Sequence, residues 1–166
     1  MRDVITLPVI ALVIGIEIFV WVRNPMHVPS AFLPARAFGL QVFQELGPSM
    51  EPAVSSGHHL LVSSWSYWKG DPQVGDVIAF AYPLDPSVAD LKRIVATPGA
   101  TVEIRDGVTL VDGRPAGLTN PTVRSMPRMQ IPAGRYFVLG DNASQSEDSR
   151  SYGLIARASI IGKRWW

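Results

Sequence analysis

The 166-residue sequence contains no cysteine, which excludes a disulfide framework and any site that depends on a thiolate. It also lacks a strong charge of either sign, because 15 basic and 14 acidic residues leave a formal net charge of +1. The sequence contains no basic tract of the kind that would indicate a nucleic acid partner. Long helical periodicity is missing after residue 22, whereas 14 Gly and 14 Pro are typical of a turn-rich, mainly β chain.

One long apolar run lies near the start of the chain. Residues 4–22 carry a single charge, Glu17, and as a helix they approach the roughly 30 Å thickness of a bilayer's hydrocarbon layer. We interpret residues 1–23 as a transmembrane anchor and the proline-rich residues 24–37 as a juxtamembrane connector. A cleaved secretory signal is the alternative, but this run exceeds the usual length of about 7–15 residues. The basic residues on the two sides nearly balance, so charge does not determine the orientation.

Beyond residue 38 the apolar positions alternate with a period of two, which predicts strands. The first, residues 38–46, runs into a Gly47-Pro48 corner. Asp106-Gly107 separates two alternating runs and predicts a hairpin over residues 101–116, with Asp112-Gly113 as a further turn. We expect other strands at residues 59–65, 76–83, 91–99 and 134–142, and a loop without elements at 117–130. Residues 38–166 are therefore predicted to form one mainly β, mostly antiparallel domain.

Ser49, in "GPSMEP", is a candidate nucleophile at that corner. A serine hydroxyl needs a base to take its proton, and histidine is the usual one. His27 lies in the connector. His58 and His59 begin a strand, where neighbouring side chains point to opposite faces, so at most one of them could face a site. Exposed or edge positions are the simpler interpretation for both.

The chain has three lysines, and a lysine can replace histidine as the base if its amine is neutral. Burial favours the neutral amine because a low dielectric penalises the ammonium form. Lys69 lies in a Trp-Lys-Gly-Asp-Pro turn, and Lys163 lies beside Arg164 near the end of the sequence. Only Lys92 lies within an apolar run, "LKRIVA". It is either a base or an edge-strand charge that discourages aggregation.

A third polar cluster occupies residues 140–153, "GDNASQSEDSRSYG". It reads as a surface loop, as a metal site, or as a loop that Asp148 holds in place by pairing with Arg150. Asp141, Glu147 and Asp148 suggest calcium, but their spacing does not fit the twelve-residue EF-hand loop. These three interpretations stay open on the pattern of residues alone.

Together and in this order, "GPSMEP", "LKRIVATPGATVEI" and "GDNASQSEDSRSYG" resemble the nucleophile, base and C-terminal boxes of type I signal peptidases. These are membrane-anchored serine peptidases of the Ser/Lys type, and the resemblance covers about residues 38–163. It implies one transmembrane helix and a twisted β-sheet catalytic domain of the signal peptidase or LexA-like type. It also implies a single-pass plasma or inner membrane protein with its catalytic domain on the extracytoplasmic side. The implied partners are preprotein signal peptides and the lipid bilayer, with no cofactor and no metal.

The resemblance also implies roles for single residues. Ser49 matches the nucleophile, Lys92 the general base, and Ser146 the hydroxyl that orients the lysine amine. Similar enzymes cut after small residues. The implied supporting ion pairs are Arg93 with Asp141 and Asp148 with Arg150. The candidate walls of the substrate pockets are Phe43, Met50 and Leu91.

The chain departs from the family pattern at two positions. Gly47 stands where some members have a serine that completes the oxyanion hole, so backbone N–H groups, that of Ser49 first, must serve. Ala143 stands where the family box often has arginine. The loop at 117–130 is short, so we expect no extra domain. Two aromatic clusters, residues 65–68 and 165–166, are expected either to contact the membrane or to pack against the domain.

Other functions remain possible on the sequence. A conjugation- or pilus-specific maturation peptidase and a mitochondrial inner-membrane peptidase share the Ser/Lys pair, although the Arg-rich presequence of an organellar protein is missing. A self-cleaving repressor would need a DNA-binding domain. A non-catalytic, membrane-anchored β module that binds peptides is the alternative from another class.

Overall fold

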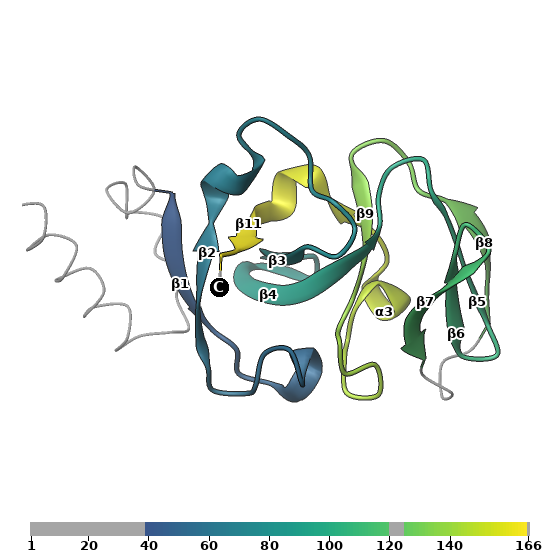
Figure 1. Ribbon diagram of the computed structural model, residues 1–166, viewed down its shortest axis with the longest axis horizontal. Helices are drawn as coiled ribbons and strands as arrows, with labels where there is room; N and C mark the ends of the chain where they lie inside the picture. Colours follow the sequence, from purple (N-terminus) through teal and green to yellow (C-terminus); the bar gives the residue numbers. More distant parts are fainter. Residues whose placement is uncertain (1–38, 120–124, 166) are drawn as a thin grey trace, which may run out of the picture.

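The computed structural model describes residues 39–119 and 125–165, and this part of the chain is mainly β, as predicted. Its strands form two sheets in which all paired strands are antiparallel (Figure 1). The larger sheet has the order β1-β2-β11-β3-β4-β9-β10, and the smaller has the order β7-β6-β5-β8. The strands of the larger sheet are β1 Leu40–Gln44, β2 His59–Ser63, β3 Val77–Tyr82, β4 Asp85–Ala96, β9 Arg135–Leu139, β10 Ile155–Ala156 and β11 Ile160–Arg164.

The smaller sheet lies at the end of the molecule opposite β1 and β2 (Figure 1). Its strands are β5 Thr101–Arg105, β6 Val108–Val111, β7 Arg114–Thr119 and β8 Met126–Gln130. Helical elements are short, and no described helix exceeds four residues. They are η1 Pro48–Met50, η2 Ser64–Tyr67, α3 Ser149–Tyr152 and η3 Arg157–Ser159.

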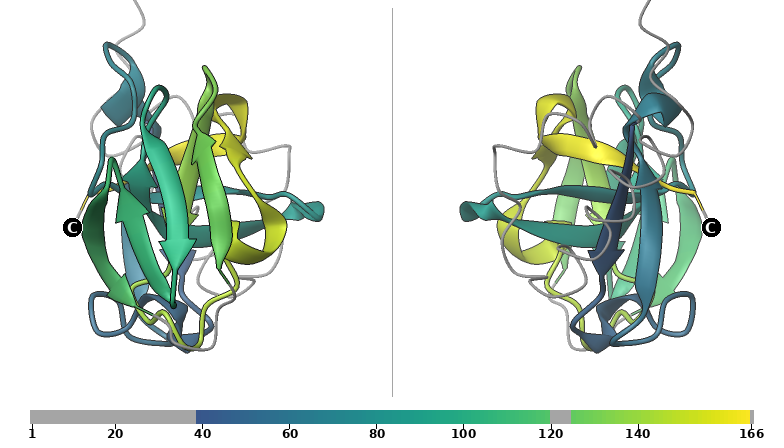
Figure 2. Two further views of the ribbon diagram at one scale, coloured as in Figure 1. Left: turned by 90° about the vertical axis from the view of Figure 1, so that its right-hand side faces the viewer. Right: turned by 90° about the vertical axis from the view of Figure 1, so that its left-hand side faces the viewer.

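The β3–β4 hairpin is the longest ladder, and its tip projects from the rest of the described structure (Figure 2). β4 begins at Asp85 rather than at the expected Leu91, because its first half pairs with the end of β3. In the second half Lys92 pairs with Ile78. Because side chains two residues apart share a face, Lys92 lies on the same face as Ile94 and its cross-strand partner Val138. These apolar neighbours bury it.

The predicted hairpin over residues 101–116 is confirmed, with two tight turns joining β5, β6 and β7. Asp106 and Gly107 have φ angles of 50° and 77°, and Asp112 and Gly113 have φ angles of 50° and 76°. Positive φ at both central residues is the signature of the turn type that fits the twist of antiparallel strands. Asp-Gly is favoured there because both residues tolerate this conformation.

The prediction of a loop without elements at 117–130 is wrong. β7 continues to Thr119, and β8, Met126–Gln130, pairs with β5. Pro127 obscured this strand, because proline cannot donate a ladder hydrogen bond. β8 tolerates this proline because the strand lies at the edge of the smaller sheet, where the ladder hydrogen bonds run to β5 on one side. The β5–β8 register also shifts between Val102 and Ile104.

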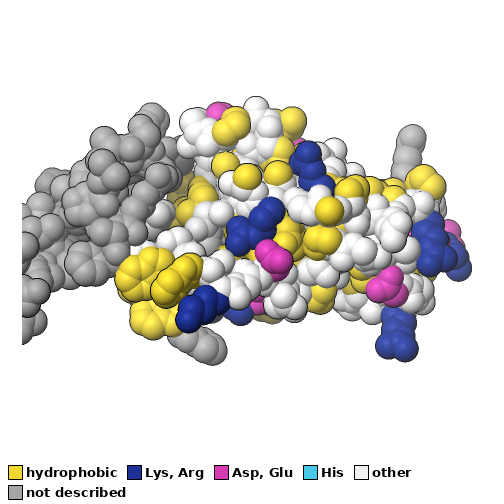
Figure 3. Space-filling view, turned by 90° about the horizontal axis from the view of Figure 1, so that it is seen from above, with side chains coloured by type: hydrophobic (Ala, Val, Ile, Leu, Met, Phe, Trp, Pro, Cys, Tyr) yellow, Lys and Arg dark blue, Asp and Glu magenta, His cyan; other side chains and the backbone are white. Residues whose placement is uncertain are grey.

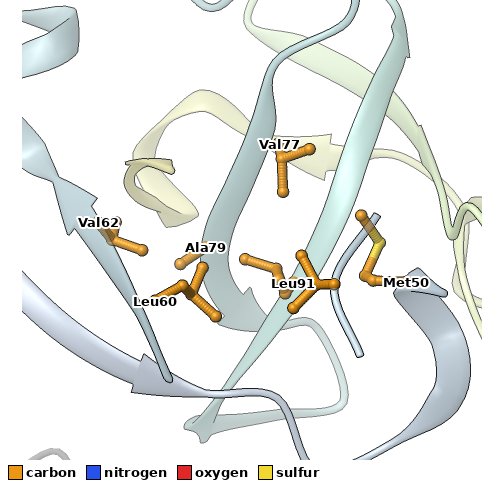
Figure 4. Packing of buried hydrophobic residues seen from close by; sticks show 7 residues of the cluster. Met50, Leu60, Val62, Val77, Ala79 and Leu91 are labelled. Atoms are coloured by element: carbon orange, nitrogen blue, oxygen red, sulfur yellow. The ribbon is translucent and has the colours of Figure 1, made fainter. Parts of the chain in front are cut away.

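Three buried hydrophobic clusters hold the sheets together, and one of them lies beneath the Gly-Pro corner. In that cluster Met50, from η1, and Leu91, from β4, are 0% and 4% exposed (Figure 4). Leu60 and Val62 of β2 and Ala79 of β3 belong to the same cluster. The neighbours of Ser49 and Lys92 in the sequence are thus anchored in one core, which limits how far the two residues can separate.

The expected anchor at residues 1–23 and connector at 24–37 lie outside the described residues. Within residues 39–119 and 125–165, no helix has the length and apolar character needed to cross a bilayer. The helical part of the fold prediction therefore stays a prediction.

Candidate active site

Ser49 lies in η1, immediately after β1 has brought the chain to the Gly47-Pro48 corner. Pro48 occupies the start of this turn, where its missing N–H costs little, and the backbone N–H of Glu51 donates to the Pro48 carbonyl at 3.1 Å. The carbonyl of Ser49 accepts from the backbone N–H of Asn142 at 2.9 Å. Together with buried Met50, these contacts fix the backbone that carries the hydroxyl.

Lys92 reaches Ser49 from β4 and is 2% exposed. Its Nζ lies 3.1 Å from Ser49 Oγ, 3.0 Å from the Leu91 carbonyl and 2.6 Å from Asp90 Oδ1. Three acceptors are the full complement of an ammonium group, which has three N–H donors. The geometry therefore places the lysine nitrogen in contact with the serine oxygen and with the Asp90 carboxylate.

Two carboxylates border this pair, and the sequence interpretation missed both. Glu45, 8% exposed, lies with Oε1 3.3 Å from Ser49 Oγ, and Asp90 forms the ion pair with Lys92. Burial raises the pKa of Glu45 and of Asp90, while the charge of Lys92 opposes the rise in each case. The sequence did contain a clue to the Asp90 contact. Asp90 lies two residues before Lys92, so both side chains lie on one face of β4.

A groove of about 460 Å³ runs between β1 and the first half of β4 and contains Ser49 and Lys92 in its lining. Of the predicted walls, Phe43 and Leu91 line this groove. Met50 does not line it and instead lies fully buried in the core below. The difference arises because η1 turns the side chain that follows Ser49 inward.

The two predicted ion pairs both have short contacts. Arg93 Nε and Nη2 lie 2.7 and 2.6 Å from the two carboxylate oxygens of Asp141. This bidentate pair raises the pKa of the Arg93 guanidinium, because Asp141 accepts hydrogen bonds from its charged form. Arg150 Nε and Nη2 lie 2.7 and 2.6 Å from the carboxylate oxygens of Asp148, which is fully buried. The loop 140–150 is thus tied to β4 and to itself.

Ser146 lies beside the site but does not make the expected contact with the lysine. Its hydroxyl donates to Asp148 Oδ2 at 2.8 Å, and its side chain packs against Gly140 next to the Ser49 carbonyl. Among the described residues the partners of Lys92 Nζ are Ser49, Asp90 and the Leu91 carbonyl. The amine has Asp90 as its carboxylate partner, and the orienting role of Ser146 stays a prediction.

The structure also shows where His58, His59 and Ala143 lie relative to Ser49. His59 lines the groove, and His58 is exposed. In the described part of the chain, the side-chain hydrogen bonds of Ser49 join it to Glu45 and Lys92. The Ala143 carbonyl accepts from Arg150 at 3.0 Å. Across these same ranges no three acidic or histidine side chains gather as metal ligands.

Comparison with known proteins agrees with the motifs. The family model described as signal peptidase, peptidase S26, matches residues 2–166. A probable signal peptidase I-1 of Synechocystis sp. is 32% identical over 97% of this chain and 79% of its own length. A signal peptidase I of Leptolyngbya laminosa is 35% identical over 71% of this chain, which spans 64% of that relative.

A solved structure shows a partial likeness. A crystal structure of a signal peptidase I from Enterococcus faecalis V583 is 30% identical, with a TM-score of 0.47, over 56% of this chain and 96% of that one. The match of the family model to nearly the whole chain, together with the Synechocystis relative, decides the assignment: this chain belongs to the signal peptidase family, peptidase S26, and is a serine peptidase.

Proposed function

We propose that this chain is a membrane-anchored endopeptidase that removes signal peptides from exported preproteins, with Ser49 as nucleophile and Lys92 as general base. One observation carries the residue assignment: Lys92 Nζ lies 3.1 Å from Ser49 Oγ while the lysine is 2% exposed. That distance is within reach for proton transfer, and the burial is what a neutral amine requires. The names of the relatives support the substrate class.

In the proposed reaction the neutral amine of Lys92 takes the proton of Ser49 while Oγ attacks the carbonyl carbon before the scissile bond. The same nitrogen then protonates the leaving amine, and a water molecule releases the acyl group from the serine. The backbone N–H of Ser49 stabilises the oxyanion, because Gly47 offers no hydroxyl for this purpose.

The substrate lies in the groove as an added strand. Among the described residues β1 is the terminal strand of the larger sheet, so we expect an extended peptide to lie along it and lead its scissile bond to Ser49. Phe43 and Leu91 border this path, and their apolar side chains fit small residues close to the cut. A larger side chain would have to displace one of these walls.

The proposed membrane location rests on two features. Residues 4–22 supply the anchor, with the peptidase domain outside the cytoplasm. Hydrophobic side chains gather on the described surface at the end that holds β1 and β2 (Figure 3). Trp65, Trp68 and Trp165, which are 58%, 79% and 51% exposed, suit the interfacial layer of a bilayer. Confining enzyme and tethered substrate to one plane raises their effective concentration.

Cleavage of a preprotein with alanine at the first and third positions before the cut tests the proposal. The full chain in detergent should cut after the small residue, and Ser49→Ala or Lys92→Ala should lower the rate by about 10³-fold or more. The exposed Ser66→Ala and Lys69→Ala serve as matched controls with unchanged rates. Equal cleavage by Lys92→Ala refutes the dyad. Binding without cleavage by the unmodified chain favours a peptide-binding module.

A further inference from the structure

The contacts of Lys92 pose a chemical problem for its role as a base. Its Nζ has three acceptors within 3.1 Å and forms an ion pair with Asp90, an arrangement that suits the ammonium form. An ammonium ion cannot take the serine proton. The proton must leave before the reaction starts. The side chain is only 3% exposed, so direct release to solvent is obstructed.

The shortest of the three contacts leads to Asp90, whose Oδ1 lies 2.6 Å from Nζ. Asp90 is the carboxylate in the ion pair, and it has a further hydrogen bond from the Leu91 backbone N–H at 2.8 Å, which fixes its orientation. The Leu91 carbonyl, the third acceptor, cannot hold a proton at ordinary pH. Asp90 is thus the partner of the amine that can accept one.

We propose that Asp90 takes the proton of the Lys92 ammonium and so frees the amine to act on Ser49. One N–H bond of Lys92 breaks and one O–H bond of Asp90 forms, so an ion pair becomes a neutral amine and a neutral carboxylic acid with no change in net charge. The amine then turns about its Cε–Nζ bond to face Ser49 Oγ. Asp90 is a positioning residue that acts through Lys92, and the inference rests on the proposed function.

Burial lowers the cost of this transfer. A dry environment penalises an ion pair far more than a neutral pair, and burial already raises the pKa of Asp90. The Asp90 side chain keeps 22% of its surface exposed, and it lines the substrate groove. A peptide strand in that groove covers this remaining surface. Substrate binding therefore shifts the pair toward its neutral form.

Other titratable groups face this pair and enter its pH dependence. Glu45 approaches Ser49 from the end of β1, and burial raises its pKa while Lys92 opposes the rise. His59 and Glu147 line the same groove. Burial first, and the charge of Asp90 in addition, raise the pKa of Tyr82 and of Tyr152, so both phenols stay neutral in the assay range. Asp148 interacts with Asp90 as well, but Arg150 balances its charge.

The test is the shape of the pH profile of kcat for wild type and Asp90→Asn. When the proton moves within the pair, the neutral fraction does not depend on bulk pH, so wild-type kcat should change less than about twofold between pH 6 and 8. In Asp90→Asn the lone ammonium must release its proton to water, so kcat should rise about tenfold per pH unit over that range, at constant KM.

Three variants sharpen the result. Asp90→Glu keeps a carboxylate and should retain the level profile with a reduced kcat. Glu103→Gln, in a surface pair on the smaller sheet, removes a carboxylate of the same 22% exposure and should leave the profile unchanged. Glu45→Gln shows how much of any fall in kcat at the low-pH end of the profile is caused by protonation of Glu45. Circular dichroism verifies that each variant is folded.

Two outcomes overturn the inference. If Asp90→Asn follows the wild-type profile, or reaches full activity at a lower pH than wild type, Asp90 only holds the ammonium in place. A raised KM with unchanged kcat would mean that Asp90 contacts substrate instead. The test uses the pH profile and the KM of Asp90→Asn, so it can fail while the loss of activity in Ser49→Ala and Lys92→Ala still supports the proposed function.

Discussion

Replacing Asp148 with asparagine removes a negative charge from a side chain that solvent does not reach. Asp148 is 0% exposed, and the side chain of its partner Arg150 is 4% exposed. One carboxylate oxygen accepts from the backbone N–H and Nε of Arg150, and the other accepts from the Gly140 backbone N–H, the Ser146 hydroxyl and Nη2 of Arg150. Whichever way the asparagine amide turns, its NH₂ group faces at least two donors.

The cost follows from this arrangement. Removing one partner of a buried pair leaves the other as an uncompensated charge, which costs about 3–5 kcal/mol. This is a large part of the total stability of roughly 5–15 kcal/mol that a domain has. For a chain of this size it corresponds to a drop in Tm of about 6–20 °C. Activity should fall as well, because Asp148 also holds Gly140 and Ser146 beside Ser49.

Thermal unfolding of the full chain in detergent measures the effect. Glu103→Gln breaks a pair whose arginine is 67% exposed, so this control should lose no more than about 1 kcal/mol. The double variant Asp148→Ala with Arg150→Ala should lose less than the sum of the two single variants, because it leaves no charge unpaired. A Tm for Asp148→Asn equal to that of the control would refute the reasoning.

Two further changes give separate tests. Burial alone would raise the pKa of Asp76, but hydrogen bonds, led by that of Lys163, lower it overall. Its stabilising contribution is therefore present above the unfolded pKa of about 3.9 and is lost as the pH falls through the lower folded value, so Asp76→Asn should reduce Tm at pH 7 and match wild type in strong acid. A Tm gap that does not narrow as the pH falls from 7 into strong acid contradicts this. Gly47→Ser should raise kcat about tenfold by adding an oxyanion donor. The new Cβ meets nothing closer than Glu45 Oε1 at 3.9 Å, so an unchanged kcat with native Tm would count against a hydroxyl role here.

Local patterns predicted the elements whose causes are local. The two Asp-Gly turns needed only residues that accept positive φ, and the burial of Lys92 followed from the apolar residues beside it. β8 escaped prediction because its pairing with β5, and not its own sequence, makes Pro127 acceptable there.

The surroundings of the dyad could be predicted only in part. The corner and the lysine were visible as motifs, but the distance between them depends on how η1 and β4 share one core. Glu45 and Asp90 were missed because their burial arises from contacts across the groove, which a single strand pattern does not contain. The turn of Ser146 toward Asp148 depends on the fold of the loop 140–150 in the same way.

The order of strands in the larger sheet has a consequence for biosynthesis. β11, although it comes last in the described chain, lies between β2 and β3 and joins the half that carries Ser49 to the half that carries Lys92. A nascent polypeptide that has emerged only as far as residue 159 already contains both residues but lacks the strand that bridges them. Such a polypeptide can still pack Met50 against Leu91, but its larger sheet stays divided between β2 and β3 until β11 has been made.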